Sequence, residues 1–224
     1  MAELGWLTRG LADVPAHDRW LSERERGVLA TLRVHKRRAD SRLGRWAAKT
    51  ALAAWRGVAP SEVEILAAAD GAPEGLIRGT PVPVRLSLSH RAGRALVVVG
   101  NGAGALGCDL EAIEARSPAF VREWLRPAER QLLAGLDVEL RELVANLLWS
   151  AKEAASKARR EGLRLDVRQA TVAPGHLERS QRSWLRLRVD WEEGPTDPGW
   201  WRREPGWVMT VVGDPADAPP SELP

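Results

Sequence analysis

The chain has 224 residues, of which 44% are hydrophobic and 28% are charged, and its formal net charge is +3. This is the balance of an ordinary soluble globular protein, long enough to bury a core as one large domain or two small ones. No apolar run approaches the roughly 20 residues needed to span a bilayer, and the first ten residues lack the continuous hydrophobic stretch of a signal peptide. The single cysteine, Cys108, cannot form an internal disulfide, so we expect a cytoplasmic protein with no membrane partner.

The small basic excess is concentrated in one segment of the chain. This segment holds the cations Arg33, Lys36, Arg37, Arg38, Arg42, Arg45 and Lys49. Such a cluster is either the solvated face of a helix or a surface that binds anions. The spacing alone does not separate these two interpretations.

Capping residues and apolar periodicity predict two helices in the first part of the chain. Ser22 and Glu25 have the spacing of a capping box, which predicts a helix from that point to about Val34. Apolar residues then recur at helical spacing over residues 43–55, and Gly57 ends the pattern.

Alternating and β-branched segments predict strands after these helices. The expected strands are residues 63–67, 84–89, 95–99 and 105–110. The short link His90–Arg94 between the second and third strands predicts a hairpin. Residues 70–83 are rich in Gly and Pro, which favours a loop.

From Ser117 onward the pattern becomes helical. Pro127 stands where a proline in the first turn of a helix is favoured, and a longer helix is predicted over residues 138–160. Three more strands are expected at residues 166–172, 184–189 and 207–212. The Pro- and acid-rich residues 214–224 are expected to form a disordered tail.

The two parts of the chain share one order of elements, a long helix followed by three strands. This order predicts an α+β fold with a pseudo-twofold arrangement of two similar halves, residues 1–104 and 105–213. Each half would be a long helix packed on a small, mainly antiparallel sheet. A cleft between the halves would then be the natural ligand site.

Two carboxylates lie close together on one predicted strand. Asp109 and Glu111 are two residues apart, so they point to the same face of the strand, while Cys108 and Leu110 face the core. Neighbouring carboxylates repel each other unless a cation lies between them, and hard oxygen ligands suit Mg²⁺. A solvated strand face explains most pairs of this kind, so the pair alone is a weak signal.

The long helix of the second half carries charges on an otherwise apolar sequence. Glu153 and Lys157 are four residues apart, which is typical of a surface salt pair. Most of their neighbours on this helix are small and apolar, and this favours a cleft instead. There Glu153 would be a third metal ligand, and Lys152 and Lys157 would bind phosphate.

His90 follows Ser89 at a predicted strand end, where its ring could donate a hydrogen bond to a phosphate. A histidine in a turn more often has no special role. The other histidines are not at metal-ligand spacing with it, which argues against a zinc site. The sequence has no Gly-rich phosphate loop and no nucleophile elbow.

The order and spacing of four motifs together resemble the 4′-phosphopantetheinyl transferase superfamily. The motifs are Leu-Gly-Arg-Trp-Ala-Ala-Lys at 43–49, Leu-Ser-Leu-Ser-His at 86–90, Gly-Cys-Asp-Leu-Glu at 107–111 and Trp-Ser-Ala-Lys-Glu-Ala-Ala-Ser-Lys at 149–157. The last motif is the most specific. The chain is most similar to the surfactin-synthetase type, in which one chain holds two similar halves.

The resemblance implies transfer of 4′-phosphopantetheine from coenzyme A to a serine of an apo acyl or peptidyl carrier protein, with release of 3′,5′-ADP. Carried over by motif, Asp109, Glu111 and Glu153 would bind Mg²⁺. Asp109, Glu153 and Lys157 would be catalytic, and Glu153 or a metal-bound water that it orients would be the general base. The implied contacts of the coenzyme A phosphates are Lys49, Ser89, His90, Lys152 and Lys157, with Arg33 and Lys36 at the 3′-phosphate.

The chain departs from the family pattern in two places. The family often has Gly-Lys-Pro before the Ser-His motif, and residues 71–73 are Gly-Ala-Pro here. The missing lysine contact would have to come from another cation, such as Arg78 or Arg85. An Asn often stands two residues before the Ser-His motif, where this chain has Ser87 or Leu88.

Carrier proteins are usually acidic around the target serine, so a cationic docking surface is expected, and we expect the enzyme to be a monomer. Residues 116–130 mix apolar side chains with arginines and fit such a surface, although a core-facing amphipathic helix fits them as well. Two other functions remain as alternatives, a Mg²⁺-dependent nuclease and a basic nucleic-acid-binding module. The helical setting of Lys152 and Glu153 disfavours the first, and the small net charge disfavours the second.

Overall fold

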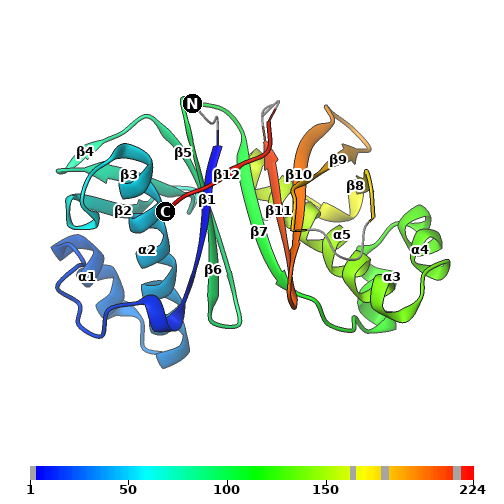
Figure 1. Cartoon of the computed structure of the whole chain (residues 1–224), viewed down its shortest axis with the longest axis horizontal. Coiled ribbons are helices and arrows are strands. Elements are labelled where there is room, and N and C mark those ends of the chain that lie inside the picture. Colours follow the sequence, from blue (N-terminus) through cyan, green and yellow to red (C-terminus); the bar gives the residue numbers. More distant parts are fainter. Residues whose placement is uncertain (1–3, 162–164, 178–181, 214–217) are drawn as a thin grey trace. The chain divides into compact units, whose positions relative to one another are not determined.

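The computed structural model describes residues 4–161, 165–177, 182–213 and 218–224 (Figure 1). The chain divides into two compact units. The first comprises the described parts of Met1–Ala103 and Pro220–Pro224, and the second those of Gly104–Pro219. Each unit combines helices with mainly antiparallel strands, so the predicted α+β class is confirmed.

Capping residues mark the start of one helix and the end of another in the first unit. Helix α1 spans Glu23–Thr31, and Ser22 and Glu25 form the predicted capping box at its start. Helix α2 spans His35–Arg56 and ends at Gly57, which adopts the left-handed conformation with φ of 67°. The predicted helices are therefore confirmed, although α1 ends three residues before the predicted boundary and α2 begins eight residues earlier.

The first unit contains two sheets. The four-stranded sheet has the order β12-β1-β6-β5, and the three-stranded sheet has the order β2-β3-β4. The strands are β1 (Leu4–Gly10), β2 (Val63–Ala67), β3 (Pro73–Ile77), β4 (Thr80–Pro81), β5 (Val84–Arg91), β6 (Arg94–Asn101) and β12 (Ser221–Glu222). The predicted hairpin is confirmed as β5 and β6, joined by Ala92 and Gly93, both with positive φ. Helix α2 packs against β1 and β6 (Figure 1).

The predicted loop at residues 70–83 is wrong, because β3 and β4 lie within it. Strand β3 pairs with β2 along its whole length and buries Leu76. Its glycine, Gly75, is needed because a Cβ there would overlap the side chain of Leu52 on α2. The glycine that suggested a loop therefore permits close packing of a strand against a helix.

Two predictions about the chain ends need correction. Strand β1 was not predicted, although it pairs with β6 over seven residues. The expectation of a disordered tail at residues 214–224 is wrong for its last part, since β12 pairs in parallel with β1 and the Leu223 amide donates to the Trp6 carbonyl. Residues 214–217 lie outside the described residues.

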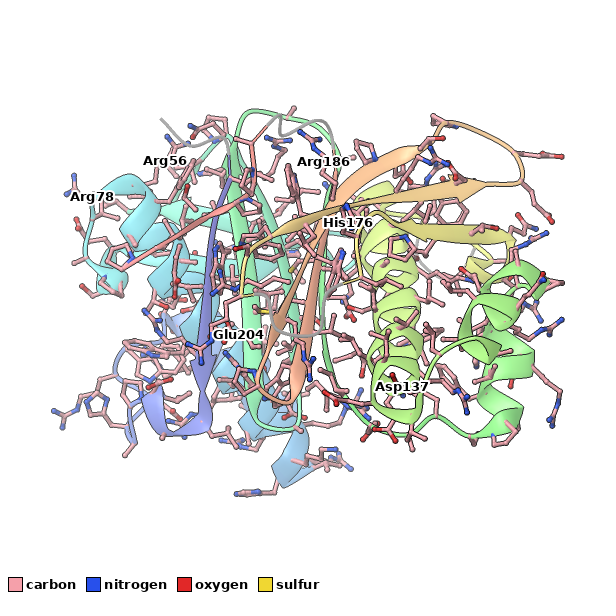
Figure 2. The ribbon with its side chains drawn as sticks, turned by 45° about the vertical axis from the view of Figure 1, so that its right-hand side comes forward. Arg56, Arg78, Asp137, His176, Arg186 and Glu204 are labelled. Atoms are coloured by element: carbon pink, nitrogen blue, oxygen red, sulfur yellow. The ribbon has the colours of Figure 1, made fainter. Side chains whose placement is uncertain are left out.

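The second unit contains three helices. They are α3 (Pro118–Trp124), α4 (Pro127–Ala134) and α5 (Val138–Arg159). Pro127 occupies the first turn of α4, as predicted, and α5 confirms the predicted long helix. The Asp137 side chain caps α5 by accepting from the Leu140 amide, and it lies at the start of that helix in Figure 2.

The sheet of the second unit has five antiparallel strands in the order β7-β11-β10-β9-β8. The strands are β7 (Leu106–Ala112), β8 (Ala170–Pro174), β9 (Leu185–Trp191), β10 (Asp197–Glu204) and β11 (Trp207–Gly213). Strand β10 was missed because Gly and Pro precede it, yet it buries Trp200 and Trp201. The strand predicted to begin at Asp166 starts at Ala170 instead, after a 3-10 turn over Val167–Gln169.

Helix α5 lies across β7 and β11, and this contact places the residues of the 107–111 and 149–157 motifs on facing elements. A Cβ on Gly107 would overlap the carbonyl oxygen of Ala154, so glycine at this position lets α5 approach the strand closely. No helix in the described part of the chain is long and apolar enough to cross a membrane.

Candidate active site

Strand β7 and helix α5 bring together the charged residues of two sequence motifs. Asp109 and Glu111 follow Gly107 at intervals of two on the strand, so all three residues face α5. Cys108 and Leu110 are buried on the other face of the strand. This confirms the predicted alternation on β7.

Helix α5 meets this strand with side chains four residues apart. Trp149, Glu153 and Lys157 therefore lie on one side of the helix. Lys157 Nζ donates to Asp109 Oδ1 (2.7 Å) and to the Cys108 carbonyl oxygen (3.1 Å). Trp149 Nε1 donates to Glu111 Oε1 (3.1 Å). These contacts fix both ends of the site, with Glu153 between them along the helix.

Glu153 is half-buried and lies within the field of both strand carboxylates. Burial raises the pKa of Glu153, and the negative charges of Asp109 and Glu111 raise it further, against the opposing effect of Lys157. The three carboxylates predicted to act together are thus close enough to affect one another electrostatically.

Lys157 keeps about a third of its side chain exposed, 33%, while its ammonium group is held by Asp109. Burial alone would lower the pKa of Lys157, but the charges of Asp109, Cys108 and Glu153 and the hydrogen bond to Asp109 together outweigh it, and the net pKa is raised. Lys157 therefore remains a cation at neutral pH. It can offer a proton donor to an anion while orienting Asp109.

The donor set of this site suits a hard divalent cation. In the described residues, no three His, Cys, Asp or Glu side chains are arranged as a preformed metal site. Cations of the protein itself contact two of the carboxylates, Lys157 at Asp109 and Arg116 at Glu111. The charges of Asp109 and Glu111 nevertheless add to burial in raising the pKa of Glu153, and carboxylate oxygens are the ligands that Mg²⁺ prefers.

Lys152, expected to contact coenzyme A, lies inside the second unit instead. Its side chain is fully buried, at 0% exposure, and its Nζ donates to Glu129 Oε2 (2.8 Å) and to the Trp124 carbonyl oxygen (2.9 Å). Glu129 also accepts from the Val172 amide through Oε1 (2.9 Å). Burial lowers the pKa of Lys152, although the adjacent Glu129 opposes that shift. In this position Lys152 ties α5 to α4 and β8 and does not face a ligand.

Lys49 occupies a similar position in the first unit. Its side chain is 1% exposed, and its Nζ donates to Glu25 Oε2 (2.7 Å). Glu25 Oε1 accepts from the Ile65 amide (3.0 Å). The prediction of a phosphate contact at Lys49 does not fit this burial, because the ammonium group points into the unit.

Ser89 and His90 lie at the end of β5, as the hairpin predicted. Ser89 is buried, whereas His90 is exposed. The His90 ring lies beside Gly44 of α2, since a Cβ on Gly44 would come within 3.8 Å of His90 Cδ2. His90 is therefore accessible to a ligand next to α2, and Ser89 is less so.

Some cations of the basic segment in the first unit bind other parts of the protein, and others are exposed. Arg38 donates to the Leu29 carbonyl oxygen in the last turn of α1, and Arg42 pairs with Asp18 (3.1 Å). Arg33 and Lys36 are exposed where α1 ends and α2 begins. These two cations remain available for an anion, as the resemblance implies.

The two candidates for the missing lysine contact have structural partners. Arg78, on the turn after β3 and labelled in Figure 2, pairs with Glu62. Arg85 Nε donates to the Asn101 carbonyl oxygen (3.1 Å). Ala72 follows a turn in which its amide donates to Asp70 Oδ1 (3.1 Å). No contact in the described residues marks either arginine as the replacement.

Residues 116–130, considered as a docking surface, form α3 and the start of α4. Leu125 is buried, while Phe120 and Trp124 pack against Trp149 with ring centroids 5.2 Å and 5.3 Å away. Arg122 is exposed, but Arg116 turns inward to Glu111. The segment therefore combines a core-facing side with a partly exposed basic side.

Sequence reasoning missed the partners of the buried lysines and of Glu111. Glu25 and Glu129 each stand third in a helix after a capping residue, and both accept from the amide at the helix start. That capping pattern was a visible signal, but it indicates only where a helix begins. Its second role, neutralising a buried lysine, depends on packing.

Comparison with known families gives one match. The family model described as the 4′-phosphopantetheinyl transferase superfamily matches residues 105–212, slightly less than half of the chain. No curated protein matches the chain. The matched region includes Asp109, Glu111, Glu153 and Lys157, and it excludes Lys49, Ser89 and His90. The second unit is thus similar to the 4′-phosphopantetheinyl transferase superfamily, and this likeness supports phosphopantetheine transfer in general.

Proposed function

We propose that the protein transfers 4′-phosphopantetheine from coenzyme A to a serine hydroxyl of an apo acyl or peptidyl carrier protein. The observation that carries this proposal is the meeting of Asp109 and Glu111 on β7 with Glu153 and Lys157 on α5. All four residues lie inside the region matched by the family model. The enzyme would be a holo-[acyl-carrier-protein] synthase of the 4′-phosphopantetheinyl transferase class.

Asp109, Glu111 and Glu153 would hold Mg²⁺, which would neutralise part of the pyrophosphate charge of coenzyme A when bound. These three carboxylates, on β7 and α5, can carry three negative charges, whereas Lys157 and Arg116 supply two positive charges. This excess supports a site for a divalent cation and a polyphosphate together.

The residues of the site would divide the work of the transfer step. The serine oxygen attacks the β-phosphorus of coenzyme A, and the bond from that phosphorus to the bridging oxygen of 3′,5′-ADP breaks. Glu153, whose pKa is raised by burial and by its carboxylate neighbours, accepts the proton of the serine hydroxyl. Lys157 stabilises negative charge on the phosphates while Asp109 holds its ammonium group in place.

The proposed coenzyme A contacts in the first unit are reduced to the accessible residues. Arg33, Lys36 and His90 are exposed, and Ser89 stands beside His90 on β5. Lys49 and Lys152 are left out, because each is buried against a glutamate. The 3′-phosphate would be bound by Arg33 and Lys36.

We also infer that the two units are related copies, as in the surfactin-synthetase type. In each unit a long helix carries a buried lysine that binds a capping glutamate, and the glutamate binds a strand amide. A pseudo-twofold relation of residues 1–104 to 105–213, a cytoplasmic location and a monomeric state belong to the same proposal. An acidic carrier would bind the exposed Arg122 of α3.

The test is incubation with coenzyme A, MgCl₂ and a panel of apo-carriers, scored by intact mass. The wild-type protein should convert at least one carrier to the phosphopantetheinylated form. The variant Glu153→Gln should keep the fold but lose about 100-fold or more in transfer rate, since it removes both a proton acceptor and an anionic ligand. Glu193→Gln, which changes an exposed glutamate of the β9–β10 turn, is the matched control.

Near-normal transfer by Glu153→Gln would contradict the assignment of Glu153. A nuclease is less well supported, because Lys152 lies on a helix and is buried against Glu129. Degradation of DNA or RNA by the wild-type protein, with no transfer to any carrier, would favour that alternative.

A further inference from the structure

Glu111 differs from the other two carboxylates in how its side chain is held. Its Oε1 accepts from Trp149 Nε1 (3.1 Å), and its Oε2 accepts from Arg116 Nη2 (2.9 Å). Two donors on opposite oxygens fix the plane of a carboxylate. Each oxygen has two lone pairs, so these bonds leave Glu111 able to bind a cation as well.

Arg116 is itself held in position from several sides. Its Nε donates to Asn146 Oδ1 (2.6 Å), and its guanidinium lies over the Phe120 ring at 4.7 Å from the centroid. Only 12% of its side chain is exposed. An arginine this restricted loses little further freedom when it binds Glu111, which makes it an effective clamp.

Asn146 anchors this arrangement to α5. It is fully buried, and its Nδ2 donates to the Glu114 carbonyl oxygen (2.7 Å) and to the Glu142 carbonyl oxygen (2.8 Å). The loop that follows β7 is thereby attached to the helix that carries Glu153. The position of Arg116 is set by the same helix as the catalytic residues.

Two aromatic residues connect Arg116 back to Glu111. Phe120 packs edge-on against Trp149, with ring centroids 5.2 Å apart, and Trp149 returns to Glu111 through its indole nitrogen. Arg116, Phe120 and Trp149 therefore form one continuous set of contacts that begins and ends at the Glu111 carboxylate.

We propose that Arg116 is a positioning residue, which with Trp149 orients Glu111 for the divalent cation that coenzyme A binding requires. This inference rests on the proposed function. It gives Arg116 a role within the active site in place of the carrier-docking role considered from the sequence. It also gives the indole nitrogen of Trp149 a role, because a phenylalanine could pack there but could not donate to Glu111.

The experiment measures Mg²⁺ binding as well as turnover. MgCl₂ is titrated by calorimetry into the protein in the presence of excess coenzyme A, and transfer rates are recorded over the same range of MgCl₂. Loss of residues that orient metal ligands typically costs 10- to 100-fold in metal affinity or activity. Arg116→Gln should therefore weaken Mg²⁺ binding by about 10-fold or more. Trp149→Phe should shift it in the same direction but less, because Arg116 remains.

Two further variants separate positioning from general stability. Glu111→Gln should lose Mg²⁺ affinity, and adding Arg116→Gln to it should cause no further loss, because Arg116 acts through Glu111. The double variant also removes the unpaired charge that Arg116→Gln leaves behind, so it remains measurable if the single variant folds poorly. Arg188→Gln, which breaks an exposed arginine–aspartate pair on β9, should leave Mg²⁺ binding unchanged.

The outcomes distinguish this inference from the proposed function. If the wild-type protein shows no Mg²⁺-dependent binding of coenzyme A, the proposed function fails. If the wild-type protein binds both but Arg116→Gln retains wild-type Mg²⁺ affinity, only the positioning role is overturned. Additive losses in the double variant would likewise overturn it.

Discussion

The two units of the protein share a framework and differ in the chemistry attached to it. Helices α2 and α5 each have 22 residues, and each buries a lysine against a glutamate. The sheet order β1-β6-β5 of the first unit corresponds to β7-β11-β10 of the second, and β2-β3 corresponds to β8-β9. The correspondence follows chain order from element to element.

The two long helices can be aligned on their buried lysines, Lys49 and Lys152. Trp46, Lys49, Thr50 and Ala54 correspond to Trp149, Lys152, Glu153 and Lys157. The tryptophan and the lysine are kept, whereas the glutamate and the second lysine occur only in α5. The shared positions thus build the fold, and the unshared ones carry the proposed chemistry.

Strands β1 and β7 also share one position and differ at others. Gly5 on β1 approaches α2 as Gly107 on β7 approaches α5, and each glycine has a neighbour on its helix that a Cβ would meet. Two and four residues later β7 presents Asp109 and Glu111, whereas the corresponding positions on β1 are Leu7 and Arg9. The first unit therefore lacks the carboxylates at the positions where the second unit has them.

The largest effects are expected from removing the buried lysines. Breaking a buried ion pair leaves an uncompensated charge and typically costs about 3–5 kcal/mol, so Lys49→Met and Lys152→Met should each lower the free energy of unfolding by about that amount. Denaturant unfolding measures this change. If Lys49 instead contacts coenzyme A, Lys49→Met would raise the KM for coenzyme A with little loss of stability.

A matched double variant sharpens this comparison. Glu129→Gln combined with Lys152→Met removes both charges and keeps an acceptor for the Val172 amide. It should recover a large part of the stability lost in Lys152→Met. No recovery would show that Glu129 is not the partner whose charge matters.

Smaller effects are expected at the two glycines, and they should be unequal. Gly107→Ala places a methyl group against the backbone of α5, which cannot move without displacing Glu153 and Lys157. The atoms nearest to the methyl group of Gly5→Ala belong to the side chains of Leu223 and Trp55, at 2.8 Å and 2.9 Å. Overpacking costs about 1–3 kcal/mol, and we expect Gly107→Ala to lie at the upper end, with loss of transfer as well. Equal thermal shifts for both variants would contradict the closer helix approach in the second unit.

Sequence reasoning recovered the elements whose signals are local. The capping box at Ser22, the left-handed Gly57 and the first-turn Pro127 each determine a boundary within a few residues. Strand β1 was missed because its partners, β6 and β12, are distant in the chain. Strands β3 and β10 pair with neighbours in the chain, and they were missed because their Gly and Pro residues are typical of loops. Gly75, which reads as a loop residue, is required by the packing of Leu52.

The same distinction applies to the site. Asp109, Glu111, Glu153 and Lys157 were predicted as one cluster, and the structure brings them together on β7 and α5. Lys152 was assigned to the ligand because its neighbour Glu153 belongs to the site. On a helix, however, adjacent residues point in directions about 100° apart, so a residue next to a catalytic one commonly faces the core. Whether a residue of the motif faces the ligand or the core is determined by its burial in the structure, and the motif alone does not show it.

The smallest expected effect is the contribution of Glu153, in the second unit, to the pH dependence of stability. The pKa of Glu153 is raised in the folded protein by burial and by the nearby carboxylates. A carboxyl group of this kind favours the folded state when protonated, so its contribution is present below the unfolded pKa and is lost as pH rises through the folded value. Folding stability should therefore fall over the weakly acidic range because of Glu153.

Glu153→Gln should reduce this dependence and make the protein more stable at neutral pH, since Gln is uncharged at every pH. Thermal melting between pH 4 and pH 7, an interval chosen to begin near the ordinary glutamate pKa of about 4.3, measures the slope. The control Glu193→Gln should leave the slope as in the wild type, because Glu193 is exposed. A variant that is less stable than wild type at neutral pH would mean that Glu153 is held by attraction to Lys157 more than it is repelled by Asp109 and Glu111. Thr50, which occupies the corresponding place in the first unit, has no charge to lose, so this instability belongs to the unit with the proposed chemistry.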